Sequence, residues 1–351
     1  MTEALKISPQ LIQNLLNIPI YLVGGAVRDT MLGKPVKDWD FTTPANPDQI
    51  EAAIAATGRK TYTIGKKFGT IGFKLEISPQ EFEYVEITTF RKELYLEKNR
   101  KPQVDFVKNI QEDLSRRDFT INGMAMKPDL KLIDPFDGVA DLKNKIIRAV
   151  GNPKIRFKED PLRMLRAIRF ASSLDFIIEQ KTWDKLCSAK WSLLDISKER
   201  WVLEMDKILS QKNPEKGLDL LMNSGLLGII IPELSLQQSY DQNSTYHDFD
   251  LWTHTKNVLI NVPHTELNLR WTALLHDIAK PFTKTENKQG YNHYLNHELL
   301  GAEMANKVCN YLKFSNERTA FIIENITNHL KTESPLKKHD DGGKKIKSIS
   351  S

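Results

Sequence analysis

The sequence predicts an α+β protein in which a small mixed-sheet domain is followed by an all-helical body and a further helical domain. Short β-rich runs and one or two helices fill the N-terminal part. From about Phe157 the apolar residues recur at helical spacing. All eight histidines lie in the last third of the chain. These changes predict domains at residues 1–150, 151–236 and 237–332, with a disordered tail at 333–351.

Length and composition indicate a soluble globular protein with two or three domains. The chain has 351 residues, of which 40% are apolar and 27% charged. Its formal net charge is +5, but residues 331–351 carry six lysines against Glu333, Asp340 and Asp341 and so supply three of these charges. The rest is nearly neutral, which makes global charge weak evidence for a nucleic-acid partner.

Cysteine usage and the N-terminus favour a cytoplasmic protein. Cys187 and Cys309 stand far apart without CxxC spacing, so the sequence suggests neither a disulfide framework nor a thiolate metal site. The chain starts MTEALK, without the basic and apolar regions of a signal peptide, and contains no run of eighteen apolar residues. We therefore expect no membrane association.

The elements of the first domain follow from local patterns. Residues 18–23 form an apolar run that ends at Gly24-Gly25, and residues 26–32 read as a short helix. The segment TYTIGKKFGTIGFKLEI predicts two strands around a Lys-Lys-Phe-Gly turn, and FEYVEITTF predicts another strand. Later, the polar stretch 237–248 is the best candidate for a linker.

The stretch DWDF carries the first chemical signal. As a strand, it directs Asp38 and Asp40 to one face and Trp39 and Phe41 to the other. Paired carboxylates suit one or two Mg²⁺ ions, which prefer oxygen ligands. Two ions about 3.5–4 Å apart activate an attacking hydroxyl and neutralise a leaving group. Glu86 in YVEITTF is a candidate third carboxylate, and an ordinary surface glutamate fits equally well.

An anion-binding signal precedes this pair. Gly24-Gly25 after a strand lets backbone N–H groups approach an anion at the start of a helix, and Arg28 lies one turn further on. A plain strand-to-helix turn explains the glycines but not Arg28 and the acidic pair together. The combination predicts a site for a nucleoside triphosphate and Mg²⁺.

Two later segments are rich in arginine. LSRRDFTINGMAM places Arg116, Arg117 and Asp118 before an apolar segment, where Asp118 could simply cap a helix. In EDPLRMLRAIRF, Asp160 and Pro161 suit the N-cap and first position of a helix. A stripe of three arginines on that helix is costly unless an anionic or planar partner faces it. The stripe consists of Arg163, Arg166 and Arg169.

The motifs GGAVRD, DWD, RRDFTING, DPFDG and EDPLRMLRAIRF, in this order, resemble the bacterial tRNA nucleotidyltransferase family, which comprises class II CCA-adding enzymes and their poly(A) polymerase relatives. The resemblance covers about residues 18–210. It implies a nucleotidyltransferase head, a neck and body that bind nucleotide and RNA, and catalytic Mg²⁺ at Asp38 and Asp40. Nucleotide-binding residues implied by the resemblance are Gly24, Gly25, Arg28, Arg117, Asp118, Asn122, Asp160, Arg163, Arg166 and Arg169.

Elementary chemistry supports an Asp160–Arg163 pair as the reader of the base. A carboxylate accepts a hydrogen bond from the exocyclic amino group of cytosine or adenine, and a guanidinium donates to ring nitrogen or carbonyl acceptors. Guanine and uracil present a carbonyl where the amino group should be, which a carboxylate repels. Each good pairing is worth about 1–3 kcal/mol of discrimination. No nucleic-acid template is needed.

The implied reaction is attack of a tRNA 3′-hydroxyl on the α-phosphate of CTP or ATP, with release of pyrophosphate. Relatives that add only CC have a shortened loop where this chain has TTFRKELYLEKNRKPQVDF, so the full loop favours CCA or A addition. The alternatives are an A-adding enzyme or a poly(A) polymerase. A non-catalytic RNA-binding protein is disfavoured by Asp38 and Asp40.

Histidines form the last signal. LLHDIAKP sets His276 and Asp277 in an apolar helix, and imidazole with carboxylate suits a divalent metal. The pattern resembles an HD domain, a helical metallophosphohydrolase module, but its usual last aspartate has no counterpart outside the predicted tail. A structural or RNA-docking role and an HD phosphohydrolase with an inactive transferase module remain alternatives. The expected ligands of a second divalent metal are His254, His276, Asp277, His297 and His329.

Overall fold

The computed structural model describes residues 5–94, 103–242, 250–286, 288 and 290–331. The chain divides into two compact units. One contains Met1–Glu159 and Ile177–Thr182, and the other contains Asp160–Phe176 and Trp183–Ser351. The second unit therefore includes both the helical body and the histidine-rich helices.

A seven-stranded mixed sheet forms the centre of the first unit, with strand order β3-β4-β5-β2-β1-β8-β9. β2 and β5 run parallel, whereas the other neighbouring strands described in this sheet pair antiparallel. The strands are β1 (Tyr21–Val23), β2 (Trp39–Thr43), β3 (Thr61–Tyr62), β4 (Thr70–Ser78), β5 (Glu81–Thr89), β8 (Ala125–Met126) and β9 (Leu132–Ile133).

The strands predicted from residue patterns are confirmed. The Lys-Lys-Phe-Gly turn lies between β3 and β4, and FEYVEITTF forms β5. In β2 the side chains of Trp39 and Phe41 are buried, whereas Asp40 lies at the partly exposed face. Asp38 is the residue immediately before the strand. The alternation that presents both carboxylates on one side is thus set by burial of the aromatic residues.

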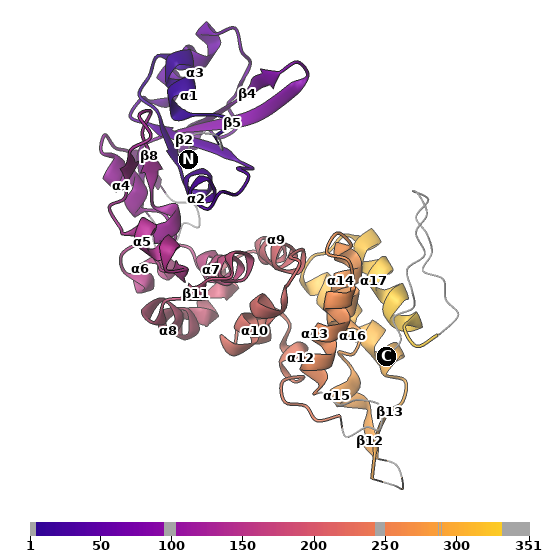
Figure 1. Ribbon diagram of the computed structural model, residues 1–351. Helices are drawn as coiled ribbons and strands as arrows, with labels where there is room; N and C mark the ends of the chain where they lie inside the picture. The colour runs from indigo at the N-terminus through magenta and orange to yellow at the C-terminus, as the bar shows by residue number, and fades with distance from the viewer. Residues whose placement is uncertain (1–4, 95–102, 243–249, 287, 289, 332–351) are drawn as a thin grey trace. The chain divides into compact units, whose positions relative to one another are not determined.

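Helices surround this sheet. α1 and α3 lie side by side near β4 (Figure 1). α3 begins with a capping box in which Asn46 and Gln49 satisfy each other's backbone N–H groups. The helices of this unit are α1 (Pro9–Leu16), α2 (Gly25–Met31), α3 (Pro47–Ala56), α4 (Ile110–Ser115), α5 (Gly138–Lys143) and α6 (Pro153–Glu159), with 3₁₀ turns η2 (Lys66–Phe68) and η3 (Thr120–Asn122).

Smaller ladders complete the first unit. β6 (Arg91–Leu94) and β7 (Gln103–Phe106) form an antiparallel pair, and β10 (Ile146–Ile147) pairs in parallel with β11 (Ile177–Ile178). The segment between β6 and β7, on which the expectation about a full-length loop depends, includes residues 95–102 and lies outside the described residues.

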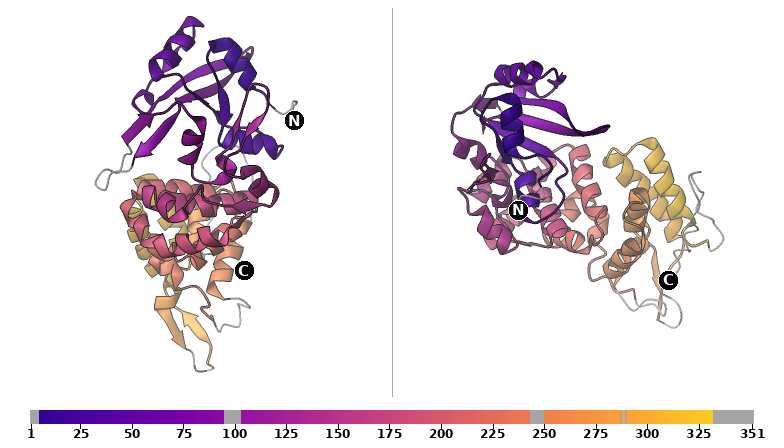
Figure 2. Two further views of the ribbon diagram at one scale, coloured as in Figure 1. Left: turned by 90° about the vertical axis from the view of Figure 1, so that its left-hand side faces the viewer. Right: turned by 45° about the horizontal axis from the view of Figure 1, so that its top comes forward.

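As far as the structure describes it, the second unit is helical apart from a short hairpin, β12 (Lys284–Glu286) and β13 (Asn292–Tyr294), which projects from the helices (Figures 1 and 2). Its helices are α7 (Leu162–Leu174), α8 (Gln180–Ala189, whose first turn belongs to the first unit), η4 (Lys190–Asp195), α9 (Lys198–Leu209), α10 (Glu215–Asn223), α11 (Leu227–Ile230), α12 (Pro232–Ser235), α13 (Leu251–Asn261), α14 (Leu267–Leu275), α15 (Lys280–Thr283), α16 (His297–Tyr311) and α17 (Asn316–Asn328).

Buried polar contacts join the body to the histidine-rich helices inside this unit. Trp271 donates from its indole nitrogen to Asp206 at 2.7 Å. Arg270 is 1% exposed and donates to the backbone oxygens of Val262, Leu209 and Gln211. These carbonyls lie at helix ends, where intrahelical donors are missing, so Arg270 satisfies them. The predicted α+β class, with a mixed-sheet head and helical remainder, is confirmed.

Three local expectations need correction. Pro161 is the N-cap of α7 rather than its first residue, although the Asp160 carboxylate still accepts from the Leu162 backbone N–H at 3.1 Å. His276 and Asp277 follow the end of α14 instead of lying inside a helix. Within the predicted linker 237–248, Gln237 and Gln242 are buried, and residues 243–249 lie outside the described part.

Residues 333–351, predicted as a disordered tail, also lie outside the described part. Among the described residues, no helix has the length and apolar character needed to cross a bilayer.

Candidate active site and metal centre

Three carboxylates gather at the junction of β2 and β5. The parallel register places Asp40 directly beside Glu86, and Asp38 immediately precedes β2. Burial raises the pKa of Asp40, and the charge of Asp38 adds to this, whereas the Arg117 cation opposes it. Burial also raises the pKa of Glu86, with further contributions from Asp40 and Asp38. Such mutual repulsion favours a site that binds cations.

Arg117 lies over Gly24 at the start of α2. Gly24 has φ +69°, which favours glycine, and a Cβ there would lie 2.7 Å from Arg117 Nη1 and displace the guanidinium. Burial lowers the pKa of Arg117, and Asp113 and Asp40 partly compensate its charge. Its Nε forms no hydrogen bond with any described residue. The Nε is itself enclosed, but the Arg117 side chain as a whole is 17% exposed and can meet an anion there.

The remaining predicted residues of the first unit form a connected hydrogen-bond network. The buried Arg28 donates to Asp29 at 2.9 Å and to Asn122 at 2.8 Å. Asn122 donates in turn to Asp118 at 3.0 Å, and the Phe119 backbone N–H donates to the same carboxylate oxygen. Arg28 thus already donates to Asp29 and Asn122. If it also contacts a phosphate, as expected, its guanidinium must bind the phosphate in addition to these two partners.

Asp160 and Arg163 lie at the N-terminal end of α7. The Asp160 carboxylate receives a hydrogen bond from Arg200 of α9 at 2.9 Å, in addition to the one from the Leu162 backbone. Arg163 is 6% exposed. Asp160 is therefore held from two sides, which fixes the direction in which its oxygens face.

The other two arginines of α7 pack on an aromatic ring. The guanidinium carbons of Arg166 and Arg169 lie 5.4 and 4.1 Å from the centroid of the Phe170 ring. Arg169 also donates to Glu204 at 2.6 Å, and Glu204 is 4% exposed. The protein itself therefore supplies the anionic and planar partners that the arginine stripe requires.

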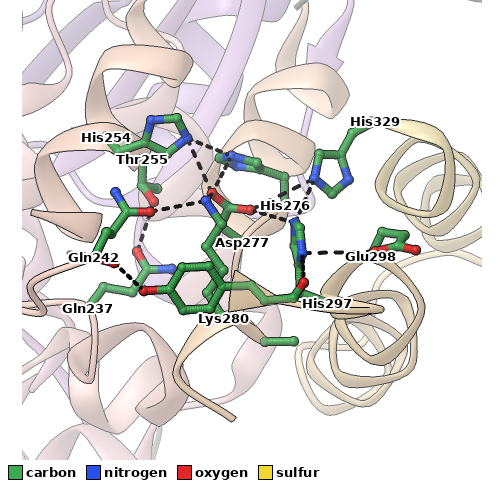
Figure 3. Close-up of polar contacts among 12 residues, drawn as sticks. Gln237, Gln242, His254, Thr255, His276, Asp277, Lys280, His297, Glu298 and His329 are labelled. Carbon is green, nitrogen blue, oxygen red and sulfur yellow. Dashed lines mark hydrogen bonds and ion pairs between the residues drawn. The ribbon is translucent and has the colours of Figure 1, made fainter. Parts of the chain in front are cut away.

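All five predicted ligands of the second metal converge in the second unit (Figure 3). Asp277 lies at their centre. Its Oδ2 is 3.2 Å from His254 Nε2 and 3.0 Å from His276 Nε2. Its Oδ1 is 3.4 Å from His297 Nε2 and 3.8 Å from His329 Nε2. Two groups of three side chains could each hold an ion and share Asp277.

The orientation of the histidines fits metal binding. The Nδ1 atoms of His276, His297 and His329 lie 2.8, 2.6 and 2.6 Å from backbone carbonyl oxygens. Such contacts fix the tautomer that leaves Nε2 free to ligate a metal. Burial, together with the nearby His276, lowers the pKa of His329 to about 4, so this imidazole is neutral at pH 7, as a ligand must be.

Asp277 itself fits the same role. It is 2% exposed, and its Oδ2 forms no well-aligned hydrogen bond with a described residue despite three nitrogen atoms nearby. The third nitrogen is Lys280 Nζ, at 2.8 Å. Lys280 also donates to Gln242 at 3.1 Å and lies over the Tyr294 ring. Lys280 thus supplies the positive charge that faces the buried Asp277 carboxylate. A metal ion bound to this carboxylate would supply positive charge in the same place.

Sequence reasoning missed Arg200 and Lys280. Lys280 lies three residues after Asp277, and this helical spacing could have indicated it. Arg200 comes from α9, and no local pattern connects it to Asp160. The last aspartate of HD domains also has no counterpart among the described residues near Asp277, and Asp340 and Asp341 lie outside the described part.

Comparison with known proteins agrees with this geometry. Three family models match: the poly A polymerase head domain at residues 20–148, the probable RNA and SrmB-binding site of polymerase A at 175–237, and the HD domain at 252–348. The Bacillus stearothermophilus CCA-adding enzyme in complex with CTP is 30% identical, covers 93% of this chain and 77% of that one, and superposes with a TM-score of 0.58.

The chain belongs to the tRNA nucleotidyltransferase and poly(A) polymerase family. Another solved member, the Thermotoga maritima CCA-adding enzyme complexed with tRNA, is 25% identical, covers 90% of this chain and 67% of that one, and has a TM-score of 0.62. The CCA-adding enzyme of Pediococcus pentosaceus is 44% identical over 207 residues, which are 59% of this chain.

The chain spans about half the length of the curated relatives it matches. Nucleotidyltransferases of this family and HD domains use divalent metals, and the carboxylate and histidine groups of this chain offer ligands of the right type for them.

Proposed function

We propose that this chain is a CCA-adding tRNA nucleotidyltransferase. It transfers CMP, CMP and AMP from CTP and ATP to the 3′ end of tRNA and releases pyrophosphate. The observation that carries the proposal is the cluster of Asp38, Asp40 and Glu86 beside Arg117, which lies over Gly24. It combines ligands for a cation with donors for a polyphosphate. The name shared by the relatives supports CCA as the product.

Within the proposed mechanism, Asp38 and Asp40 would hold Mg²⁺, and the ion would supply positive charge to neutralise the reacting phosphate. Residues 1–150 carry this chemistry. Residues 151–236 bind nucleotide and RNA, and residues 237–332 form the HD-like domain. The nucleotide is contacted by Gly24, Gly25, Arg28, Arg117, Asp118, Asn122, Asp160, Arg163, Arg166 and Arg169.

An assay with two RNA substrates tests the proposal. A tRNA that lacks its last three nucleotides, and one that ends in CC, are each incubated with CTP, ATP or both. We expect CMP incorporation on the shorter RNA and AMP incorporation on the one ending in CC. Incorporation of AMP alone, without CMP on the shorter RNA, would instead identify an A-adding enzyme or a poly(A) polymerase.

The choice of base is a separate prediction. Replacing Asp160 by asparagine is expected to lower the preference for CTP and ATP over UTP and GTP about tenfold, because an amide also donates to a base carbonyl. The measurement is the ratio of kcat/KM values for the four nucleotides. Asp175→Asn at the exposed C-cap of the same helix is the control, since Asp175 is paired with Lys216. Unchanged ratios in the Asp160 variant would contradict this role.

A second candidate function rests on the histidine centre. The convergence of His254, His276, Asp277, His297 and His329 supports metal-dependent hydrolysis of phosphoesters. The expected result is hydrolysis that requires added divalent metal and disappears in His276→Ala, while nucleotide transfer persists. An HD phosphohydrolase with an inactive transferase module would hydrolyse phosphoesters without adding any nucleotide.

A further inference from the structure

Asp113 is a fully buried carboxylate to which none of the roles above applies. It lies in α4, four residues before Arg117, and is 0% exposed. Its Oδ1 accepts from Arg116 Nε at 3.0 Å and Nη2 at 2.9 Å, and from the Arg91 backbone N–H at 3.2 Å. Three N–H groups therefore fix one oxygen, and with it the plane of the carboxylate.

The other oxygen faces Arg117. Asp113 Oδ2 lies 3.7 Å from Arg117 Nη2, and it forms no hydrogen bond with any residue that the structure describes. At this distance the two charges attract each other, but the donors of the guanidinium are not consumed. Arg117 Nη1 at the same time lies close to Gly24. The guanidinium is thus confined between a fixed carboxylate and a glycine while its N–H groups can bind a further anion.

We propose that Asp113 is a positioning residue that orients Arg117 toward the polyphosphate of the incoming nucleotide. The inference rests on the proposed function, because it assigns Arg117 to the nucleotide. A neutral residue at position 113 would remove the attraction that holds the guanidinium, and a displaced guanidinium binds phosphate less well. Arg116 and the Arg91 backbone N–H affect Arg117 only indirectly, because they hold the Asp113 carboxylate in place.

A purely structural role for Asp113 makes a different prediction, so a double-mutant cycle separates the two. Asp113→Asn and Arg117→Gln are made singly and together in the full chain, and the Kd for ATP with Mg²⁺ is measured by calorimetry. Asp113→Asn is expected to raise this Kd about tenfold. Loss of a residue that orients a ligand-binding group, without touching the ligand itself, commonly has an effect of this size. In the Arg117→Gln background the same change should raise it less than about twofold, because the two residues act as one unit.

Steady-state kinetics and folding controls complete the test. Asp113→Asn should raise the KM for ATP and leave the KM for tRNA unchanged. Asp129→Asn, at an exposed carboxylate of the same unit paired with Lys131, should change neither. Thermal unfolding verifies that each variant is folded. If Asp113→Asn does not fold, Asp113→Glu replaces it in the cycle, since it keeps the charge but displaces the oxygens.

The outcomes are distinguishable. Equal weakening of ATP binding in both backgrounds, or unchanged binding in the Asp113 variant, overturns the positioning role while the proposed function stands. A wild-type chain that binds neither ATP nor CTP overturns the proposed function, and this inference with it.

Discussion

Replacing Asp40 by asparagine is expected to abolish nucleotide transfer without unfolding the chain. A metal ion stabilises the transition state by several kcal/mol, so losing about 4 kcal/mol slows transfer about 10³-fold. The same replacement should raise the thermal stability of the chain. Burial and the charge of Asp38 raise the pKa of Asp40, so the folded chain binds this proton more tightly than the unfolded chain. Ionised Asp40 therefore destabilises the fold above its ordinary pKa, and its neutral replacement should raise the Tm at pH 7.

The measurements are the rate of AMP addition to tRNA ending in CC and the Tm at pH 7. Asp48→Asn is the matched control, because Asp48 is an exposed carboxylate of the same unit, with 83% of its side chain accessible. We expect both quantities to stay near the wild-type values in this control. Full activity in the Asp40 variant would exclude Asp40 as a metal ligand. Inactivity accompanied by a lower Tm would attribute the loss to unfolding.

Replacing Asp277 by asparagine is expected to remove metal binding at the histidine centre. Both groups of histidines share this carboxylate, so affinity for a divalent ion should fall by more than about 100-fold. The variant also leaves Lys280 buried without its counter-ion, which should destabilise the chain by about 3–5 kcal/mol. Adding Lys280→Met should restore the stability but not the metal affinity.

Titration of Mn²⁺ by calorimetry measures this effect, in chains that also carry Asp40→Asn so that the carboxylate cluster contributes little. Glu317→Gln, at an exposed residue of α17, is the control and should bind Mn²⁺ as its parent does. Unchanged Mn²⁺ affinity after loss of Asp277 would show that the histidines alone hold the ion, or that the ion binds elsewhere.

Local patterns sufficed to predict the alternation in β2 because burial of Trp39 and Phe41 dictates which way Asp38 and Asp40 face. They could not decide the role of Glu86. Its position beside Asp40 depends on which strand pairs with β2 and in which register, and strand pairing is a property of the whole sheet.

The arginines of α7 illustrate a second limit. Their spacing correctly predicted a helix with a costly charged stripe, but not the partner of each charge. Glu204 and Arg200 come from α9, 35 and 40 residues away from Arg169 and Asp160. Such pairs depend on how two helices pack against each other. In contrast, the gathering of four histidines around Asp277 was predictable, because histidine and aspartate are among the few residue types that ligate metals.

The parallel pairing of β2 and β5 has a consequence for folding. Asp40 and Glu86 are 46 residues apart in the chain, and β4 and the turn that joins it to β5 lie within that interval. Hairpins form early because their ends are close in sequence, whereas the β2–β5 pair must wait for closure of the longer loop. The repelling carboxylates thus meet only after the β4–β5 hairpin has formed. Divalent cations should therefore slow unfolding of the first unit more than they speed its refolding.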